Sequence, residues 1–172
     1  TGDIALPSFS YLLQKNLVGL VTQPDKPVGR KQVLTAPKIK ELASEHQIPV
    51  FQPEKVSDAS FLAQLEALEP DVIVVMAYGQ ILPQALLDIP SRAIINLHAS
   101  LLPKYRGASC IQAALKNGDA ETGWSVIHVV KRLDAGNLIL QKVVSILKGE
   151  TGGELHDRLA QAGPAACQAA LQ

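Results

Sequence analysis

The segment Ile94-Ile95-Asn96-Leu97-His98 reads as an apolar strand with two polar side chains, and it continues into the loop Ala99-Ser100-Leu101-Leu102-Pro103-Lys104-Tyr105-Arg106-Gly107. Side chains two positions apart project from the same face of a strand, so Asn96 and His98 are expected side by side at its carboxyl end. Open α/β sheets bind ligands at the carboxyl ends of their strands. An amide donor beside an imidazole suits reactions that develop an oxyanion and move a proton. The segment therefore predicts both a strand of an α/β sheet and a candidate site at its end.

Segments typical of helices and strands alternate along the rest of the chain. Asp71–Met76 (DVIVVM) is an unbroken apolar run of the kind that forms a strand buried on both faces. The residues from Gln23 to Ala36 include two prolines and a glycine and are expected to form a long loop. Further strands are expected at Leu17–Val21, Val50–Gln52, Ala93–Leu97, Trp124–Val130 and Leu138–Ile146, and helices at Leu6–Lys15, Pro37–His46, Asp58–Leu68, Pro83–Leu87, Cys110–Lys116 and Glu154–Gln172, the last interrupted at Gly163-Pro164.

This order predicts a three-layer α/β domain with a mostly parallel sheet flanked by helices. The last two strands have no helix between them, which predicts an antiparallel edge near the C-terminal end. The chain opens Thr1-Gly2-Asp3 and passes into a helix without a strand before it. Doubly wound domains normally feed their first helix from a strand. We therefore expect residues 1–172 to be one domain that lacks its first strand.

Composition restricts the class of protein. With 172 residues, 47% hydrophobic and 19% charged, the chain is expected to fold around a single core and not to be disordered. No apolar run approaches the roughly 18–20 residues of a membrane span, and the N-terminus lacks a signal-peptide pattern. Cys110 and Cys167 have no metal or redox spacing and read as reduced thiols. A monomeric cytoplasmic protein that binds no metal and no membrane is expected.

Positive charge is concentrated in one segment of an otherwise neutral chain. Between Thr22 and Lys40 there are five basic residues and one acidic residue, Asp25, a local net charge of +4. One interpretation is a solvated loop followed by a helix face, and the other is a contact with an anionic partner.

Asn96, His98 and Asp134 form a candidate constellation for acyl or formyl transfer to an amine. Asn96 can donate to the oxyanion of a tetrahedral intermediate, and His98 can move the proton. Asp134 lies in a predicted turn between strands and can orient His98 or a water, while Gly136 lets the backbone approach a ligand closely. The same residues are also compatible with structural roles, because Asp-Ala-Gly is an ordinary turn sequence.

The run from Asn96 to Gly107, followed by Leu133-Asp134-Ala135-Gly136, closely resembles the folate-dependent formyltransferase family. The resemblance implies a Rossmann-like formyltransferase domain that moves a formyl group from 10-formyltetrahydrofolate to an amine, with Asn96, His98 and Asp134 as the catalytic set. It also implies that the backbone of residues 77–83 lines the pterin pocket. The residues implied to bind folate are Gln80, Ile81, Leu82, Ser100, Leu101, Leu102, Pro103, Leu133, Ala135 and Gly136.

The segment from Thr22 to Arg30 resembles the basic loop with which some members of this family engage the acceptor end of initiator tRNA. It implies tRNA contacts by Lys26, Arg30 and Lys31, methionyl initiator tRNA as the acceptor, and a role in translation initiation. Such members also have a C-terminal tRNA-binding β-barrel domain, which these 172 residues do not include. Members that formylate an amino-sugar nucleotide or glycinamide ribonucleotide, and a non-catalytic folate- or RNA-binding module, remain alternatives.

The sequence departs from the family pattern near the candidate site. Ala99 stands where Gly or Pro is usual, Ser109-Cys110 replaces an Ala-Pro pair, and Asn137 replaces a common Asp. None of these residues belongs to the implied catalytic set, so the departures concern loop geometry.

Overall fold

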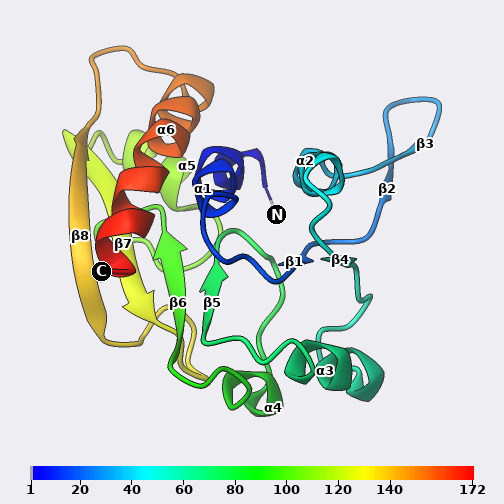
Figure 1. The fold of residues 1–172 in the computed structure, drawn as a ribbon. Coiled ribbons are helices and arrows are strands. Elements are labelled where there is room, and N and C mark those ends of the chain that lie inside the picture. Colours follow the sequence, from blue (N-terminus) through cyan, green and yellow to red (C-terminus); the bar gives the residue numbers. More distant parts are fainter. Residues whose placement is uncertain (1) are drawn as a thin grey trace.

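The computed structural model describes residues 2–172. Thr1, the first residue of the Thr1-Gly2-Asp3 segment discussed above, lies outside this range. Helices pack on both sides of a central sheet (Figure 1). The helical elements are η1 (Asp3–Ala5), α1 (Leu6–Leu12), α2 (Lys38–Glu45), α3 (Ala59–Glu66), α4 (Gln84–Leu87), α5 (Cys110–Lys116) and α6 (Gly152–Ala170). The strands are β1 (Leu20–Val21), β2 (Lys26–Val28), β3 (Val33–Thr35), β4 (Val50–Phe51), β5 (Val72–Val75), β6 (Ala93–His98), β7 (Glu121–His128) and β8 (Leu138–Ser145). None of the helices in residues 2–172 has the length and apolar character to cross a bilayer.

The predicted α/β architecture, with parallel strands, flanking helices and an antiparallel edge, is confirmed. Four strands pair in the order β5-β6-β7-β8, and β1 pairs with β4 in a separate parallel ladder. The antiparallel part is wider than predicted, because β7 runs antiparallel to β6 as well as to β8.

The alternation of side chains along β6 divides the core into two clusters. Ile95 and Leu97 pack into the main core, together with residues of α1, α2, α5 and α6. Ile94 packs on the other face, with residues of α3 and α4. Because positions two apart share a face, Asn96 and His98 continue the Ile94 face beyond the end of this second cluster. One face of β6 therefore packs into the second core cluster at Ile94 and carries the polar side chains Asn96 and His98 farther along the strand.

Helix α6 is continuous, and the predicted interruption at Gly163-Pro164 is wrong. Its buried face, which includes Leu155 and Leu159, packs into the main core and holds the helix together across Pro164. The buried Trp124 ring donates from Nε1 to the Leu159 carbonyl at 2.9 Å. The helix also begins earlier than predicted, because Thr151 and Glu154 form a capping box.

The segment predicted as a long loop forms an antiparallel hairpin, β2–β3, in which Lys26 is paired with Thr35. Gly29 (φ 71°) and Gln32 (φ 49°) adopt left-handed backbone conformations in its turn. The prolines of the segment led to the prediction of a loop instead of this hairpin. Figure 1 shows the hairpin projecting from the body of the protein at the upper right.

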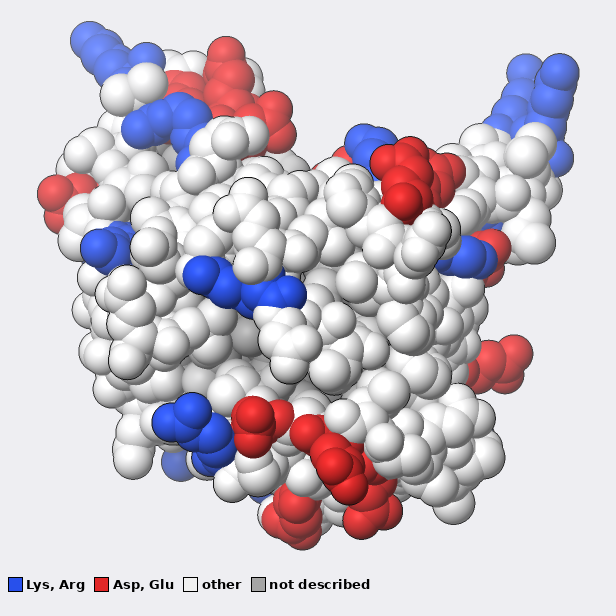
Figure 2. Space-filling view, in the orientation of Figure 1, with Lys and Arg blue, Asp and Glu red and all other residues white. Residues whose placement is uncertain are grey.

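Two of the five basic residues of this region are neutralised near the base of the hairpin. Lys40 lies 2.8 Å from Asp25, and Lys38 lies 2.6 Å from Asp3. The bond from Gln52 and then the Lys40 ammonium hold the pKa of Asp25 below its ordinary value. Lys26, Arg30 and Lys31 are exposed and form no ion pair within residues 2–172. Basic side chains cover the tip of the hairpin at the upper right of Figure 2.

The expected burial of Asp71–Met76 is only partly observed. Met76 is buried, but each of the four residues of β5 remains half-buried. The open edge of β5 borders an apolar slot of about 390 Å³ that separates it from β1. The strand expected at Leu17–Val21 is likewise reduced to Leu20–Val21, which pairs with β4 alone in the described chain.

Candidate active site

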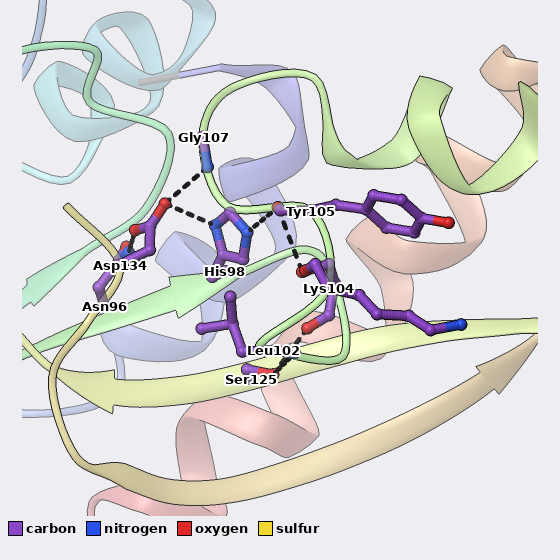
Figure 3. A network of polar contacts seen from close by, with 9 residues as sticks. Asn96, His98, Leu102, Lys104, Tyr105, Gly107, Ser125 and Asp134 are labelled. Atoms are coloured by element: carbon purple, nitrogen blue, oxygen red, sulfur yellow. Dashed lines mark hydrogen bonds and ion pairs between the residues drawn. The ribbon is translucent and has the colours of Figure 1, made fainter. Parts of the chain in front are cut away.

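Asp134 lies against both polar residues of β6. Its Oδ1 accepts a hydrogen bond from Asn96 Nδ2 at 3.3 Å, and its Oδ2 lies 3.7 Å from His98 Nδ1 (Figure 3). Oδ2 also accepts the backbone N–H of Gly107 at 2.8 Å. The side chains of His98 and Asp134 are each 8% exposed. Residues separated by 38 positions in the sequence are therefore brought together in one nearly dry cluster, as the sequence predicted.

The loop that carries Asp134 is anchored to the sheet on both sides. His128 donates its N–H to the Asn137 carbonyl at 3.0 Å, and Val129 donates to the Ile94 carbonyl at 2.9 Å. Asp134 has a left-handed backbone, with φ 45°, a conformation in which Asp and Asn are over-represented. Such strained residues concentrate at functional sites. Gly136 allows a close approach to the backbone of His128.

The imidazole of His98 has its two nitrogens in different environments. Nε2 lies 2.8 Å from the carbonyl oxygen of Tyr105. Because a carbonyl only accepts, Nε2 carries a hydrogen in this arrangement. Nδ1 faces the Asp134 carboxylate, 3.7 Å from its Oδ2. Tyr105 is itself fixed, because its hydroxyl donates to Asp119 at 2.8 Å and accepts from Asn117 at 2.9 Å.

A buried serine connects the loop after β6 to the neighbouring strands. Ser125 Oγ, on β7, donates to the Ser100 carbonyl at 2.7 Å and accepts the N–H of Leu102 at 2.9 Å. Gln141, on β8, donates to Ser125 Oγ at 2.9 Å and to the Leu102 carbonyl at 3.0 Å. Ser100 Oγ then donates to the Lys104 carbonyl at 2.6 Å. These hydrogen bonds hold residues 100–104 in place. The next residue, Tyr105, accepts a hydrogen bond from His98 through its carbonyl oxygen.

Substitution Ser125→Ala is expected to lower the free energy of unfolding by about 1–3 kcal/mol, because it leaves buried backbone groups of this loop unpaired. Chemical denaturation measures the loss. Thr122→Val is the matched control, since Thr122 is a buried residue of the same strand whose hydroxyl has no partner among the described residues. Equal unfolding free energies for Ser125→Ala and the unsubstituted protein would show that the hydroxyl does not stabilise the loop.

The Ser125–Gln141 contact and the backbone groups of Tyr105 and Gly107 were not predicted from the sequence. The one available signal was a serine within the apolar run from Trp124 to Val130. Backbone donors and acceptors leave no signal in residue identity.

The residues implied to bind folate occupy different environments. Ser100 is fully buried, whereas Ile81 and Leu133 are exposed to 77% and 61%. The Gln80 side chain is used to hold a neighbouring loop, accepting from Val56 N–H at 2.9 Å and donating to the Glu54 carbonyl at 3.2 Å. Leu101, Leu102 and Pro103 lie on the loop after β6, Ala135 and Gly136 follow Asp134, and Leu82 packs with the α3–α4 cluster.

Other reactive groups are not arranged as a second centre. Burial raises the pKa of the Cys110 thiol, and the nearby Asp134 carboxylate adds to the effect, so the thiol is a poor nucleophile. Residues 2–172 contain no group of three His, Cys, Asp or Glu side chains placed to hold a metal ion. No hydrogen bond or ion pair in this part of the chain joins Lys26, Arg30 or Lys31 to the Asp134 cluster.

A family model described as formyl transferase matches residues 10–171. The chain belongs to the formyltransferase family. A methionyl-tRNA formyltransferase of Akkermansia muciniphila is 56% identical over 165 residues, which cover 95% of this chain and 52% of that protein. A methionyl-tRNA formyltransferase of Halalkalibacterium halodurans is 47% identical over 167 residues, covering 96% and 53%. This formyltransferase chain therefore spans about half the length of the relatives it matches.

Solved structures support the same fold. A phosphoribosylglycinamide formyltransferase from Bacillus halodurans superposes with a TM-score of 0.81 at 23% identity, covering 99% of this chain and 88% of that one. A glycinamide ribonucleotide transformylase from Geobacillus kaustophilus gives a TM-score of 0.77 at 26% identity, covering 99% and 91%. The formyltransferase fold is thus shown both by sequence and by structure.

Proposed function

We propose that this formyltransferase domain moves a formyl group from 10-formyltetrahydrofolate to the α-amine of methionyl initiator tRNA, the reaction that prepares this tRNA for translation initiation. The observation that carries the proposal is the single Asp134 carboxylate contacting both Asn96 and His98. The names of relatives at 47–56% identity support the choice of acceptor.

The reaction requires an oxyanion donor and a proton route at one point. The amine nitrogen forms a bond to the formyl carbon, and the carbonyl oxygen becomes an oxyanion that Asn96 and a protonated His98 stabilise. The bond from that carbon to the folate nitrogen then breaks, while the amine loses a proton and the folate nitrogen gains one. His98 Nδ1, next to Asp134, relays this proton directly or through a water. The products are a formamide on the acceptor and tetrahydrofolate.

The loop around Asp134 supplies the closing side of the proposed folate site. Leu133 is exposed to 61% beside the nearly buried Asp134, so it is free to cover a bound pterin. Leu101, Leu102 and Pro103 form the opposite side, on the loop that Ser125 and Gln141 hold. Ser100 is fully buried and supports this loop through its hydrogen bond to the Lys104 carbonyl. We assign Gln80 an indirect role, because its side chain is engaged with the neighbouring loop.

The acceptor is tested by offering 10-formyltetrahydrofolate with methionyl initiator tRNA, glycinamide ribonucleotide or an amino-sugar nucleotide, and detecting the formylated product by mass spectrometry. Formylation of the tRNA-linked methionine alone is expected. Formylation of another amine would retain the site and overturn the acceptor. Binding of folate without transfer to any of the three would indicate a binding module.

Arg30→Ala is expected to weaken tRNA binding and to reduce its salt dependence. Arg30 is exposed at the tip of the β2–β3 hairpin and forms no ion pair within residues 2–172, so it is free to neutralise a phosphate. Each phosphate contact contributes roughly 0.7–0.9 to the slope of log K against log salt. Binding isotherms at four salt concentrations measure this slope.

Lys148→Ala is the matched control for Arg30→Ala. Lys148 is also exposed and unpaired in the described chain but lies after β8, so the substitution removes the same charge elsewhere. We expect the slope of this control to equal that of the unsubstituted protein. An Arg30→Ala slope that also stays unchanged would remove the hairpin from the tRNA interface.

A further inference from the structure

We infer that Asp119 and Asn117 are positioning residues for His98, and that they act through Tyr105. The Tyr105 hydroxyl donates to Asp119 Oδ2 at 2.8 Å and accepts from Asn117 Nδ2 at 2.9 Å. The Tyr105 carbonyl in turn lies 2.8 Å from His98 Nε2. Only the effect on kcat rests on the proposed reaction, because the orientation of the imidazole is measured without it.

The two positioning side chains come from a turn of fixed geometry at the end of α5. Gly118 has a left-handed backbone, with φ 68°, and donates its N–H to the Leu115 carbonyl at 3.0 Å. Asp119 donates its N–H at 3.1 Å to the carbonyl of Ala114, a fully buried residue. These two bonds form a Schellman motif, which ends a helix in one defined conformation. Helix α5 therefore holds Asn117 and Asp119 in position.

The backbone conformation of Tyr105 requires such an anchor. Its φ is 55°, in the left-handed region, which bulky residues rarely adopt. A residue persists there only where its surroundings impose the conformation. Ser100 Oγ lies 3.5 Å from the Tyr105 carbonyl, a long contact, whereas both bonds of the hydroxyl are short. Figure 3 shows the Tyr105 ring extending away from His98, so the anchor lies at the opposite end of the residue from the carbonyl.

The position of the Tyr105 carbonyl determines the orientation of the His98 ring. A carbonyl oxygen only accepts, so it selects the orientation that turns Nε2–H toward it. With Nε2 in that place, Nδ1 faces Asp134, 3.7 Å from Oδ2. A flipped ring would place carbon atoms at both positions and lose both contacts. Loss of the hydroxyl contacts releases Tyr105 from its left-handed conformation, and the carbonyl then turns away from Nε2.

Asp119→Ala is the test, and Asp119→Asn is its matched control. Alanine removes the acceptor of the Tyr105 hydroxyl, whereas the amide oxygen of asparagine still accepts from it. NMR of the protein with ¹⁵N-labelled histidine follows the His98 Nε2–H signal and its exchange with solvent, and His98→Gln assigns the signal. We expect Asp119→Ala to speed this exchange by about tenfold, the effect of losing one ordinary hydrogen bond. Asp119→Asn should leave the exchange unchanged.

Formyl-transfer kinetics on the same variants measure the consequence for the proposed reaction. We expect Asp119→Ala to lower kcat by about tenfold or more, because a displacement of about 1 Å at a catalytic group costs on the order of 10²-fold. Lys104→Met removes the other partner of the Asp119 carboxylate, an exposed ammonium 3.4 Å from Oδ2. Exposed ion pairs contribute little, so this variant should change neither the His98 signal nor kcat.

Tyr105→Phe is the second variant, in which the ring still packs against the main core but the hydroxyl is absent. It should match Asp119→Ala. An unchanged Nε2–H signal in both folded variants would overturn the positioning role. An equal change in Asp119→Asn would also overturn it, because the negative charge and not the acceptor would then be required. Faster exchange with an unchanged kcat would support the positioning role and would instead remove His98 from the proposed reaction.

Discussion

Substitution Asp134→Asn is expected to lower kcat by about 10²–10⁴-fold, the range for loss of a positioned acid–base group. Asparagine has nearly the same size and tolerates the left-handed backbone at this position, where φ is 45°. It replaces a carboxylate that lies 3.7 Å from His98 Nδ1 with a neutral amide, so the charged oxygen facing the imidazole is lost. Steady-state formyl transfer to methionyl initiator tRNA measures the effect.

Asp88→Asn is the matched control, since Asp88 is an exposed carboxylate that accepts from Gln84 at 2.8 Å, outside the candidate site. Its kcat is expected to equal that of the unsubstituted protein. His98→Gln should lose activity to the same extent as Asp134→Asn, and the double variant should lose little more, because the two residues act as a unit. A folded Asp134→Asn protein that retains kcat within a factor of ten would remove Asp134 from the proton route.

The sequence predicted those parts of the fold that depend on local pattern. The apolar run at β5, the alternation in β6 and the helix of Cys110–Lys116 were recognisable because a single segment contains the whole signal. Strand periodicity predicted that Asn96 and His98 share one face. The position of Asp134 was not predictable in this way, because β7 runs antiparallel to β6, so the turn after β7 leaves the sheet near the start of β6 and folds back to the two side chains.

Features that depend on contacts between distant segments were not predictable. The proline-containing segment at Lys26–Thr35 forms a hairpin because two left-handed residues close its turn. Pro164 remains within α6 because packing against the core outweighs the local penalty of proline. The Ser125 contacts join β7 and β8 to the loop after β6, so they depend on how these three segments pack and not on the sequence of any one of them.

Substitution Gly136→Ala is expected to reduce kcat by about 10²-fold or more, through displacement of the Asp134 loop. A Cβ at this position would lie 1.6 Å from the carbonyl oxygen of His128 and 2.7 Å from its carbon. These are backbone atoms at the end of β7 and cannot move aside as a flexible side chain can. The loop must shift, and a displacement of about 1 Å at a catalytic group costs on the order of 10²-fold in rate.

The loss of activity in Gly136→Ala should exceed its loss of stability, which is expected to be about 1–3 kcal/mol, as for other overpacked sites. Urea denaturation and formyl-transfer kinetics on the same preparation separate the two effects. Gly153→Ala is the matched control, because a Cβ there meets no atom within 4 Å in the described chain and lies in the first turn of α6. It should keep full activity and gain up to about 1 kcal/mol, since alanine favours a helix over glycine. Full activity in Gly136→Ala would show that the loop can shift without moving Asp134, and the close packing of the loop on β7 would then not determine the position of the carboxylate.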